Sequence, residues 1–499
     1  MKKTDIHWNL EDDISVHPLI RKILFEVKKK NRKLFCNWIN NISKKHLKNF
    51  DWWLTIPSSR NPYLSNLYDY ICILETLDIL IRKKIKLIIT TSSKGLHQII
   101  KKKEILNNSL LKIKLIKKNS KFEFLYIPKA IIFYSIIFFF IKIFIKKNNL
   151  LYGTKNILIE SFFLTNSNNK ESFNKNIFKI NYKKIFLVPN FLIQKNVFLI
   201  LKKISRLNTS KYIFKEHHLK LSDLIYSLFH FIRKKNFLSK YEKFKNWDLS
   251  SLVNEEIRSN KNYYSAIIGI LNLRFFKRIK EKNISLKKTI SLFENQAVGR
   301  GWSLGSRTFY PDVENLGYQG YINFSQFLNS MPCKFEEEAK ILPNKIAVIN
   351  KIFKKNKREF FPKIKVIPAP ALNYQFKDKK ITKKFSNEFL LVLTGIKKVD
   401  QKLIDWSFKF LDTNKDVRLK IRFHPILPSK SLNIPLINNS NNQIIFSNED
   451  ISLLLKRAFL VVSTGPTTAI YEALLNDCYL IVPVFDPCDK TNLENCKIP

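Results

Sequence analysis

The chain has 499 residues, which is too long for one ordinary hydrophobic core and favours two domains. Apolar residues make up 45% of it, a normal globular share that excludes wholesale disorder. The net charge of +48 comes from lysines dispersed along most of the chain, without any of the common nucleic-acid-binding motifs, so we expect no nucleic-acid partner.

The excess of lysine has two interpretations. Lys, Asn, Ile and Phe all have AT-rich codons and all look inflated here, so a biased genome explains much of the charge. The other interpretation is attraction to anionic lipid or to phosphorylated substrates.

The cysteines and the N-terminus indicate a reducing compartment. Six cysteines occur without a CxxC pair or a metal-ligand spacing, so we expect neither a disulfide framework nor a metal site. The opening "MKKTDIHWNLEDD" turns acidic where a signal peptide would become apolar, so no export signal is predicted. A cytoplasmic protein is therefore expected.

Residues 1–370 predict an N-terminal α/β domain. Residues 1–50 look helical and basic, and 191–285 look mostly helical. Apolar runs with polar ends predict strands at Ile85–Ser93, Lys155–Phe163, Lys184–Asn190, Thr289–Gln296, Asn315–Ile322, Lys345–Asn350 and Lys363–Pro370.

One segment of this domain is suited to a membrane. "AIIFYSIIFFFIKIFI", residues 130–145, is apolar apart from Lys142 and is flanked by further lysines. A membrane span needs about twenty apolar residues, so this one is short. Three interpretations stay open: a buried core helix, a helix on or re-entering the membrane surface, and a short span with snorkelling lysines. The second would make the protein peripheral to the inner membrane, with its anionic surface as a partner.

Residues 385–499 predict a second, smaller α/β domain. Its strands are near-continuous apolar runs that alternate with helical patterns, which indicates βαβ units and a parallel sheet. The proline-rich stretch at residues 367–376 is interpreted as the linker between the domains. Strands are expected at Phe389–Gly395, Val417–Pro425, Gln443–Asn448, Phe459–Val462 and Cys478–Val484.

The turn within "FLVVSTGPTTAIYEALLNDCYLIVPV", residues 459–484, is the most informative stretch of the chain. It lies at the carboxyl end of a strand and opens a helix, where free N–H groups and the helix dipole favour an anion. Gly465 allows close backbone approach, and Pro466 fits a first helical turn. We interpret the turn as a diphosphate site, with a simple N-cap as the alternative. The hydroxyl donors are Ser463, Thr464, Thr467 and Thr468.

The helix after this turn and other strand ends of the second domain supply further candidates. Glu472, within the helix, could accept hydrogen bonds from ribose hydroxyls, and His424 in "RFHP" could bind phosphate or act in acid–base chemistry. Thr394 and Gly395 could border the same crevice. The competing interpretations are a solvated helical glutamate and a capping histidine.

In the first domain, Glu294 of "FENQAVGRGW" directly follows a strand and is the candidate general base for an acceptor hydroxyl. The segment "DWWLTIPSSRNPYLS" is rich in aromatic side chains, which stack on sugar rings, although it could equally be a packed loop. Candidate acceptor-side residues are Arg60, Asn61, Arg300, Tyr318 and Gln319.

The order of these motifs resembles a known family. "RFHP" followed by "STGPTTAIYEALL" resembles the donor-binding half of GT-B glycosyltransferases, in which two Rossmann-like domains face a cleft. Together with "DWWLTIPSSRNPYLS", "FENQAVGRGW" and "GYQGY", it is similar to bacterial surface-carbohydrate biosynthesis proteins of polysaccharide and lipopolysaccharide loci. The resemblance implies sugar transfer from a nucleotide-activated donor to a saccharide or lipid-linked acceptor, with no metal or cofactor. It assigns donor binding to His424, Ser463, Thr464, Gly465, Thr467 and Glu472, and the base to Glu294.

Two departures from the resembled pattern keep alternatives open. Pro466 replaces the usual small residue, and the chain ends at Pro499, where the resembled fold continues with helices. The alternatives are a nucleotide-sugar epimerase on the same fold and an inactive or scaffolding protein with a truncated second domain.

Overall fold

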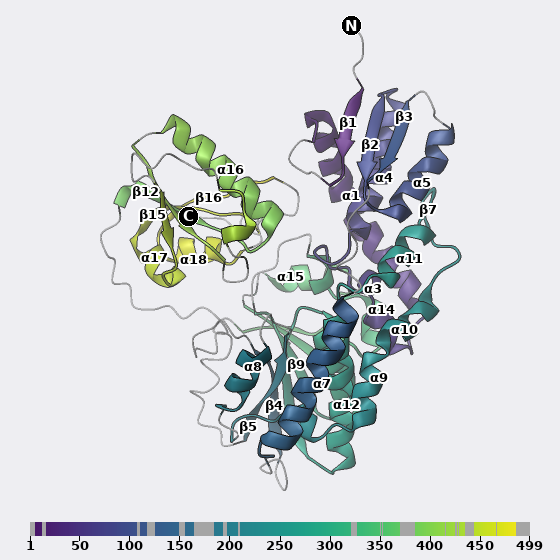
Figure 1. The fold of residues 1–499 in the computed structure, drawn as a ribbon, viewed down its shortest axis with the longest axis vertical. Helices are drawn as coiled ribbons and strands as arrows, with labels where there is room; N and C mark the ends of the chain where they lie inside the picture. Colours follow the sequence, from purple (N-terminus) through teal and green to yellow (C-terminus); the bar gives the residue numbers. More distant parts are fainter. Residues whose placement is uncertain are drawn as a thin grey trace. The chain divides into compact units, whose positions relative to one another are not determined.

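The structure is a computed structural model, and its two compact units are described separately (Figure 1). The first unit consists mainly of residues 17–320 and 328–373, and the second mainly of residues 374–499. Most of the expected linker, and Pro466, lie outside the described residues. The described residues are 5–11, 16–106, 110–116, 125–148, 155–163, 184–192, 197–207, 210–320, 327–349, 351, 353–369, 385–414, 416–424, 427, 429–434, 444–465 and 467–485.

A six-stranded parallel sheet forms the centre of the first unit. Its order is β11-β10-β9-β8-β4-β5, which in chain order is a 2-1-3-4-5-6 arrangement. This is a doubly wound order whose direction of growth changes between β4 and β8. Its strands are β4 (Asn156–Phe163), β5 (Ile185–Phe191), β8 (Leu286–Leu292), β9 (Glu314–Tyr318), β10 (Lys345–Val348) and β11 (Val366–Pro368).

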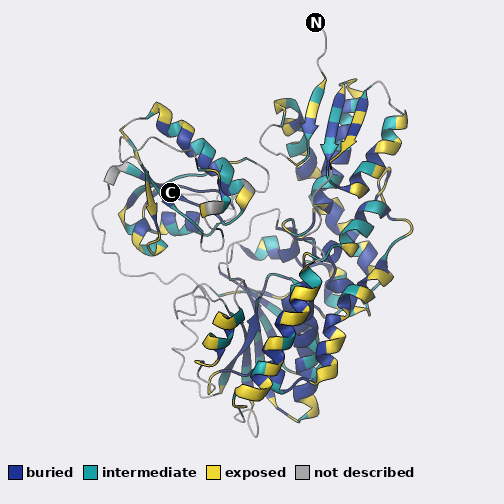
Figure 2. Ribbon diagram, viewed as in Figure 1, coloured by how far each residue is buried: buried dark blue, intermediate teal, exposed yellow. Residues whose placement is uncertain are grey.

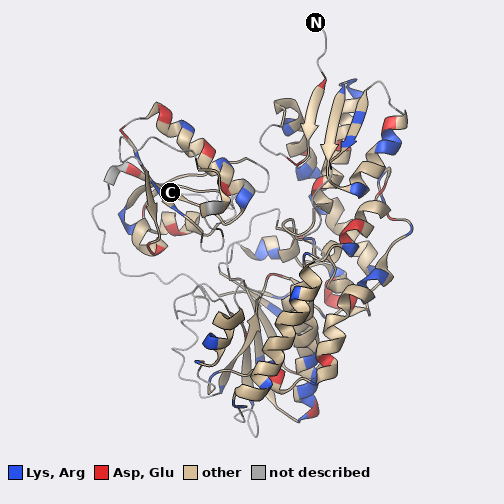
Figure 3. Ribbon diagram, in the orientation of Figure 1, with Lys and Arg blue, Asp and Glu red and all other residues tan. Residues whose placement is uncertain are grey.

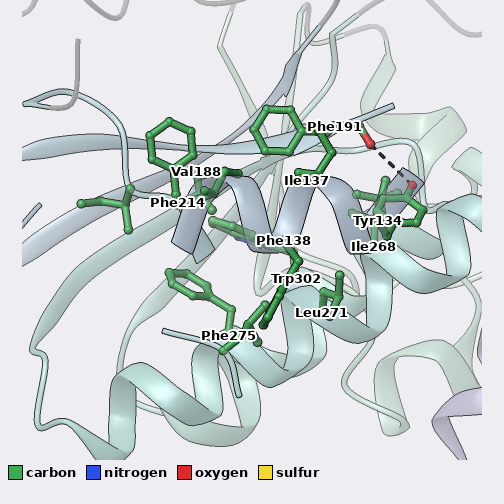
Figure 4. Close-up of a cluster of buried hydrophobic side chains, with 14 of the residues drawn as sticks. Tyr134, Ile137, Phe138, Val188, Phe191, Phe214, Ile268, Leu271, Phe275 and Trp302 are labelled. Carbon is green, nitrogen blue, oxygen red and sulfur yellow. Dashed lines mark hydrogen bonds between the residues drawn. The ribbon is translucent and has the colours of Figure 1, made fainter. Parts of the chain in front are cut away.

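Helices pack on this sheet and enclose an extended hydrophobic core. The buried stripe of α7 (Tyr126–Phe144) contributes Tyr134, Ile137 and Phe138, which pack against sheet and helix side chains (Figure 4). The helices that follow α7 in the first unit are α8 (Val197–Ile204), α9 (Leu221–Leu228), α10 (His230–Arg233), α11 (Ser250–Arg258), α12 (Tyr263–Glu281), α13 (Ala297–Phe309), α14 (Lys334–Glu338) and α15 (Phe353–Lys357), and of these α8, α9 and α12 contact α7.

Two of these helices, α12 and α13, cross at glycine. A Cβ atom added to Gly301 would lie 1.9 Å from the carbonyl oxygen of Gly269, and one added to Gly269 would lie 2.4 Å from that of Ala297. The backbones therefore touch, and neither position has room for a methyl group.

We expect Gly301→Ala to lower the free energy of unfolding by about 1–3 kcal/mol, because the added methyl must push the two backbones apart. The matched control is Gly299→Ala on the same helix, whose Cβ would meet its nearest neighbour at 3.5 Å. The control should keep or raise stability, by up to about 1 kcal/mol. Chemical denaturation of both variants checks this, and equal stability of the two would contradict the close crossing.

A separate three-stranded parallel sheet, in the order β1-β2-β3, lies in the N-terminal part of the same unit. The expectation that residues 1–50 are helical is wrong at β1 (Ile6–Asn9), whose four residues pair in register with Leu87–Thr90 of β2 (Leu87–Thr91). Strand β3 (Leu111–Leu115) was not predicted. The other elements here are α1 (Pro18–Lys44), α2 (Phe50–Trp53), α3 (Ile56–Ser59), α4 (Leu67–Arg82) and α5 (Lys94–Leu106), and a β6–β7 hairpin (Lys243–Phe244, Trp247–Asp248) follows later in the chain.

The second unit is a five-stranded parallel sheet with helices, in the order β14-β13-β12-β15-β16. In chain order this is 3-2-1-4-5, the Rossmann arrangement. The expected α/β class with doubly wound parallel sheets is therefore confirmed. The elements are β12 (Phe385–Val392), α16 (Lys397–Thr413), β13 (Arg418–Arg422), β14 (Ile444–Ser447), α17 (Ile451–Arg457), β15 (Ala458–Val462), α18 (Ala469–Leu475) and β16 (Tyr479–Ile481).

Candidate functional site

The strand order of the second unit defines where a ligand would bind. From β12 the chain adds β13 and β14 on one side, and then returns to add β15 and β16 on the other. The carboxyl ends of β12 and β15 therefore flank the switch point, which is where open α/β sheets bind ligands. The sequence candidates Thr394 and Ser463 follow these two strands.

The loop after β12 is fixed by a buried carboxylate. Asp400 accepts hydrogen bonds from the backbone N–H of Thr394 at 2.6 Å, from the Thr394 hydroxyl at 2.8 Å and from the Gly395 N–H at 2.8 Å. Burial raises the pKa of Asp400. Because all three donors are bonded to Asp400, Thr394 and Gly395 form the edge of the site through their backbone.

His424 lies directly against this loop. Gly395 has a φ of +85°, and a Cβ added to it would be 2.5 Å from Nδ1 of His424. Only glycine satisfies both the backbone angle and the contact. Burial, with the charge of Arg422, lowers the pKa of His424, which favours the neutral imidazole at neutral pH.

The loop after β15 ties the sheet ends together. The Ser463 hydroxyl donates to the carbonyl oxygen of Val392, at the end of β12, at 2.7 Å. The Thr464 hydroxyl donates to the carbonyl oxygen of Pro483 at 2.9 Å. Both side chains are buried, as is Gly465, so their part in shaping the switch point is structural.

The hydroxyls at the start of α18 make longer hydrogen bonds than those of Ser463 and Thr464. The Thr467 hydroxyl accepts the N–H of Ala469 at 3.3 Å, and the Thr468 hydroxyl lies 3.5 Å from Oε1 of Glu472. Burial raises the pKa of Glu472, which is half-buried. The N–H groups of Tyr471 and Glu472 donate to the carbonyl oxygen of Thr468 at 3.0 and 3.2 Å, so what suits this end to an anion is the positive end of the helix dipole.

A second switch point lies in the first unit, between the carboxyl ends of β4 and β8. Glu294 follows β8 there and is half-buried. Tyr318 ends β9 and is buried, and burial with the charges of Glu160 and Glu294 raises its pKa. Gln319 is buried and its side-chain oxygen accepts the N–H of Ile349 at 3.3 Å.

Glu160, within β4, is a candidate that sequence reasoning missed. It is buried, and its Oε1 accepts hydrogen bonds from the amides of Asn190 at 3.0 Å and Asn272 at 3.1 Å. Lys215 donates to the oxygens of both amides. The other carboxylate oxygen of Glu160 has no hydrogen-bond partner among the described residues.

Burial shifts the pKa values of the two ionisable side chains of this network, Glu160 and Lys215, towards neutrality. Burial raises the pKa of Glu160 to about 7, with the charge of Glu294 acting in the same direction. Burial lowers the pKa of Lys215 to about 8. Perturbed groups beside a switch point are typical of functional sites. The signal in the sequence was a carboxylate inside the apolar strand "ILIESFF".

Arg60 and Arg300 lie in a buried network around Glu336. Each guanidinium donates to Oε1 of Glu336 at 2.7 Å, and the Asn295 amide donates to the same oxygen at 3.0 Å. Nε of Arg300 donates to Asn295 at 3.1 Å. Asn61 is also buried, and its side-chain oxygen accepts a backbone N–H at 3.0 Å.

This network fixes the loop that carries Glu294. The Asn295 amide also donates to the carbonyl oxygen of Asn329, and the Asn329 amide returns a 2.7 Å hydrogen bond to the carbonyl oxygen of Glu294. Arg60 and Arg300 therefore act on the candidate base through its loop, and contact of either with an acceptor stays a prediction.

The structure thus gathers the candidates at two places. Thr394, Gly395 and His424 meet at one switch point, where the β15 loop and α18 also begin. Glu294 and Tyr318 meet at the other, with Glu160 beside them. Among the described residues, no group of three or more His, Cys, Asp or Glu side chains is arranged to hold a metal ion.

No protein-family model and no curated protein matches the chain. Solved structures do. The glycotransferase of kitacinnamycin is similar with a TM-score of 0.39 and 8% identity, over 67% of this chain and 82% of that one. The S. aureus MnaA–UDP complex is similar with a TM-score of 0.37 and 11% identity, over 66% of this chain and 79% of that one. Acinetobacter baumannii MurG is similar with a TM-score of 0.34 and 8% identity, over 66% of this chain and 79% of that one.

Proposed function

We propose that the protein is a glycosyltransferase that moves a sugar from a nucleotide-activated donor to a saccharide or lipid-linked acceptor in bacterial surface polysaccharide synthesis. The observation that carries the proposal is the Rossmann strand order of the second unit, with Thr394, Gly395, His424 and the loop from Ser463 at its switch point. The choice of sugar transfer as the reaction comes from the resemblance of the sequence motifs to GT-B glycosyltransferases.

In this mechanism the donor phosphate sits at the start of α18. The positive end of the α18 dipole, with the hydroxyls of Thr467 and Thr468, stabilises the charge that develops on the leaving diphosphate, or monophosphate if the donor is a CMP-sugar. Glu472 accepts hydrogen bonds from the ribose. The neutral imidazole of His424 donates to a phosphate oxygen, so no bound metal is invoked.

Glu294 acts on the acceptor in the same proposal. It takes the proton of the acceptor hydroxyl as the oxygen attacks the anomeric carbon, while the bond from that carbon to the phosphate oxygen breaks. The electron pair leaves with the nucleotide. The Asn190 and Asn272 amides, which bridge the buried Glu160 and Lys215, keep a hydrogen-bonded network in place beside this base.

A thermal-shift panel tests the donor site, with CMP-, UDP-, GDP- and dTDP-sugars as ligands. One nucleotide class should raise the melting temperature, because donor at about 100 times its Kd stabilises the folded protein by about 2.7 kcal/mol. The shift should disappear in Thr467→Ala/Glu472→Ala. The matched control is Thr413→Ala/Asp416→Ala, at the opposite edge of the same sheet, which should keep it.

Two results would contradict the proposal. One is a folded wild-type protein that shifts with none of the four nucleotide classes. The other is a shift that survives in Thr467→Ala/Glu472→Ala, which would move the donor away from α18.

A further inference from the structure

Helix α7 is apolar on two opposite sides, although only one of them is covered. By length and composition alone, α7 is long and apolar enough to cross a membrane. Of its most apolar 18-residue stretch, 33% is buried in the protein. The covered stripe, including Phe133, Ile137 and Ile141, packs into the core of the first unit. A helix on the surface of a soluble protein would carry polar residues on its other side.

The uncovered side of α7 is an apolar stripe. Ile132 is 59% exposed, Phe139 45% and Ile143 68%, and their spacing places them with Ile136 along one face of the helix. In Figure 2, exposed positions recur along the length of α7. Several exposed apolar side chains in a row mark an interaction surface.

Two helices that contact α7 also expose apolar side chains. Helix α8 contacts α7 and exposes Phe198, at 81%, and Leu199. Helix α9 contacts α7 as well and exposes Leu221 and Ile225. We call the whole the apolar face; it consists of Ile132, Ile136, Phe139, Ile143, Phe198, Leu199, Leu221 and Ile225.

Exposed lysines lie on the helices that carry the apolar face and in the chain directly next to them, and Figure 3 shows Lys and Arg on many other elements as well. The lysines on and next to these helices are Lys129, Lys142, Lys146, Lys147, Lys202 and Lys220. Apolar side chains among lysines complement a bilayer with anionic headgroups. A second copy of the chain fits less well, because it would bring the same lysines together and add to the repulsion from a net charge of +48.

We propose that the apolar face is a docking surface for a bilayer containing anionic lipid, on which the first unit rests without crossing it. A span is disfavoured because withdrawing α7 into the membrane would expose the core it fills. The Tyr134 hydroxyl also donates to the carbonyl oxygen of Tyr264 at 3.3 Å, which ties α7 to α12. The surface deepens the proposed function, since a lipid-linked acceptor would be met there.

Flotation of the full-length protein with vesicles tests this surface. The probes are phosphatidylcholine vesicles with and without phosphatidylglycerol. We expect binding to the anionic vesicles alone and release at high salt. Ile143→Ser/Phe198→Ser should lower the partition coefficient about tenfold or more, because two apolar side chains no longer insert. The matched control is Ile105→Ser/Leu453→Ser, which removes two exposed apolar side chains elsewhere and should keep binding.

Any of the following outcomes would overturn the proposal. The first is a wild-type protein that stays unbound at low salt, or a Ile143→Ser/Phe198→Ser variant that binds as well as the control. The second is resistance to extraction by high salt and alkaline carbonate, which indicates a span. The third is vesicle-free self-association that the same variant abolishes, which assigns the face to a second copy. Nucleotide thermal shifts of these variants report on the donor site separately, so failure of the surface and failure of the proposed function are distinguishable.

Discussion

Glu336→Gln is expected to lower the free energy of unfolding of the first unit by about 3–5 kcal/mol. The Glu336 carboxylate is the only anion that accepts hydrogen bonds from Arg60 or Arg300 among the described residues, and all three side chains are at most 3% exposed. A neutral amide would leave two buried guanidinium charges without compensation. Denaturant unfolding followed by circular dichroism measures the loss.

The control for this variant is Glu338→Gln on the same helix, α14. Glu338 is 42% exposed and lies 3.6 Å from Lys334, so its loss should change stability by no more than about 0.5 kcal/mol. If Glu336→Gln were as stable as this control, the buried network would not hold the Arg60 and Arg300 segments together.

Glu294→Gln is expected to lower the rate of sugar transfer by about 10²–10⁴-fold, because the amide keeps the shape of the side chain but cannot take a proton. Donor affinity should stay unchanged, since the donor site is proposed in the other unit. The measurement is nucleotide release with the donor that the thermal-shift panel identifies, together with the shift itself in wild type and variant.

Glu314→Gln supplies the matched control for the proposed base. Glu314 begins β9 at the opposite edge of the same sheet, where it pairs with Lys288 and Lys345. It should keep the wild-type rate. A rate near wild type in Glu294→Gln as well would remove Glu294 from the mechanism.

Most of both doubly wound sheets could be predicted from the sequence, because each strand is a short apolar run with a polar end. The "KNILIESFF" and "FLVV" runs have few other interpretations, since helices cover both faces of such strands. Strand β1 was missed because its four residues are held by pairing with β2, about eighty positions later, and "IHWN" carries no pattern of its own.

Candidate site residues could be predicted from the sequence only where a single segment contains both the strand and the residues that follow it. Thr394, Gly395 and the loop from Ser463 follow their strands directly, so strand ends located them. The roles of Arg60 and Arg300 could not be derived in this way. Their partner Glu336 belongs to another segment, and a sequence gives no sign that three distant charges share one buried position.

The buried arginines have a consequence for synthesis of the chain. Arg60 and its counter-ion Glu336 are separated by 276 residues. At about 5–20 residues per second, the ribosome adds Glu336 roughly 14–55 s after Arg60. During this interval the first unit cannot close over Arg60 without burying an unpaired charge. The nascent chain therefore has to wait with its N-terminal apolar segments open, within reach of chaperones and of other nascent chains.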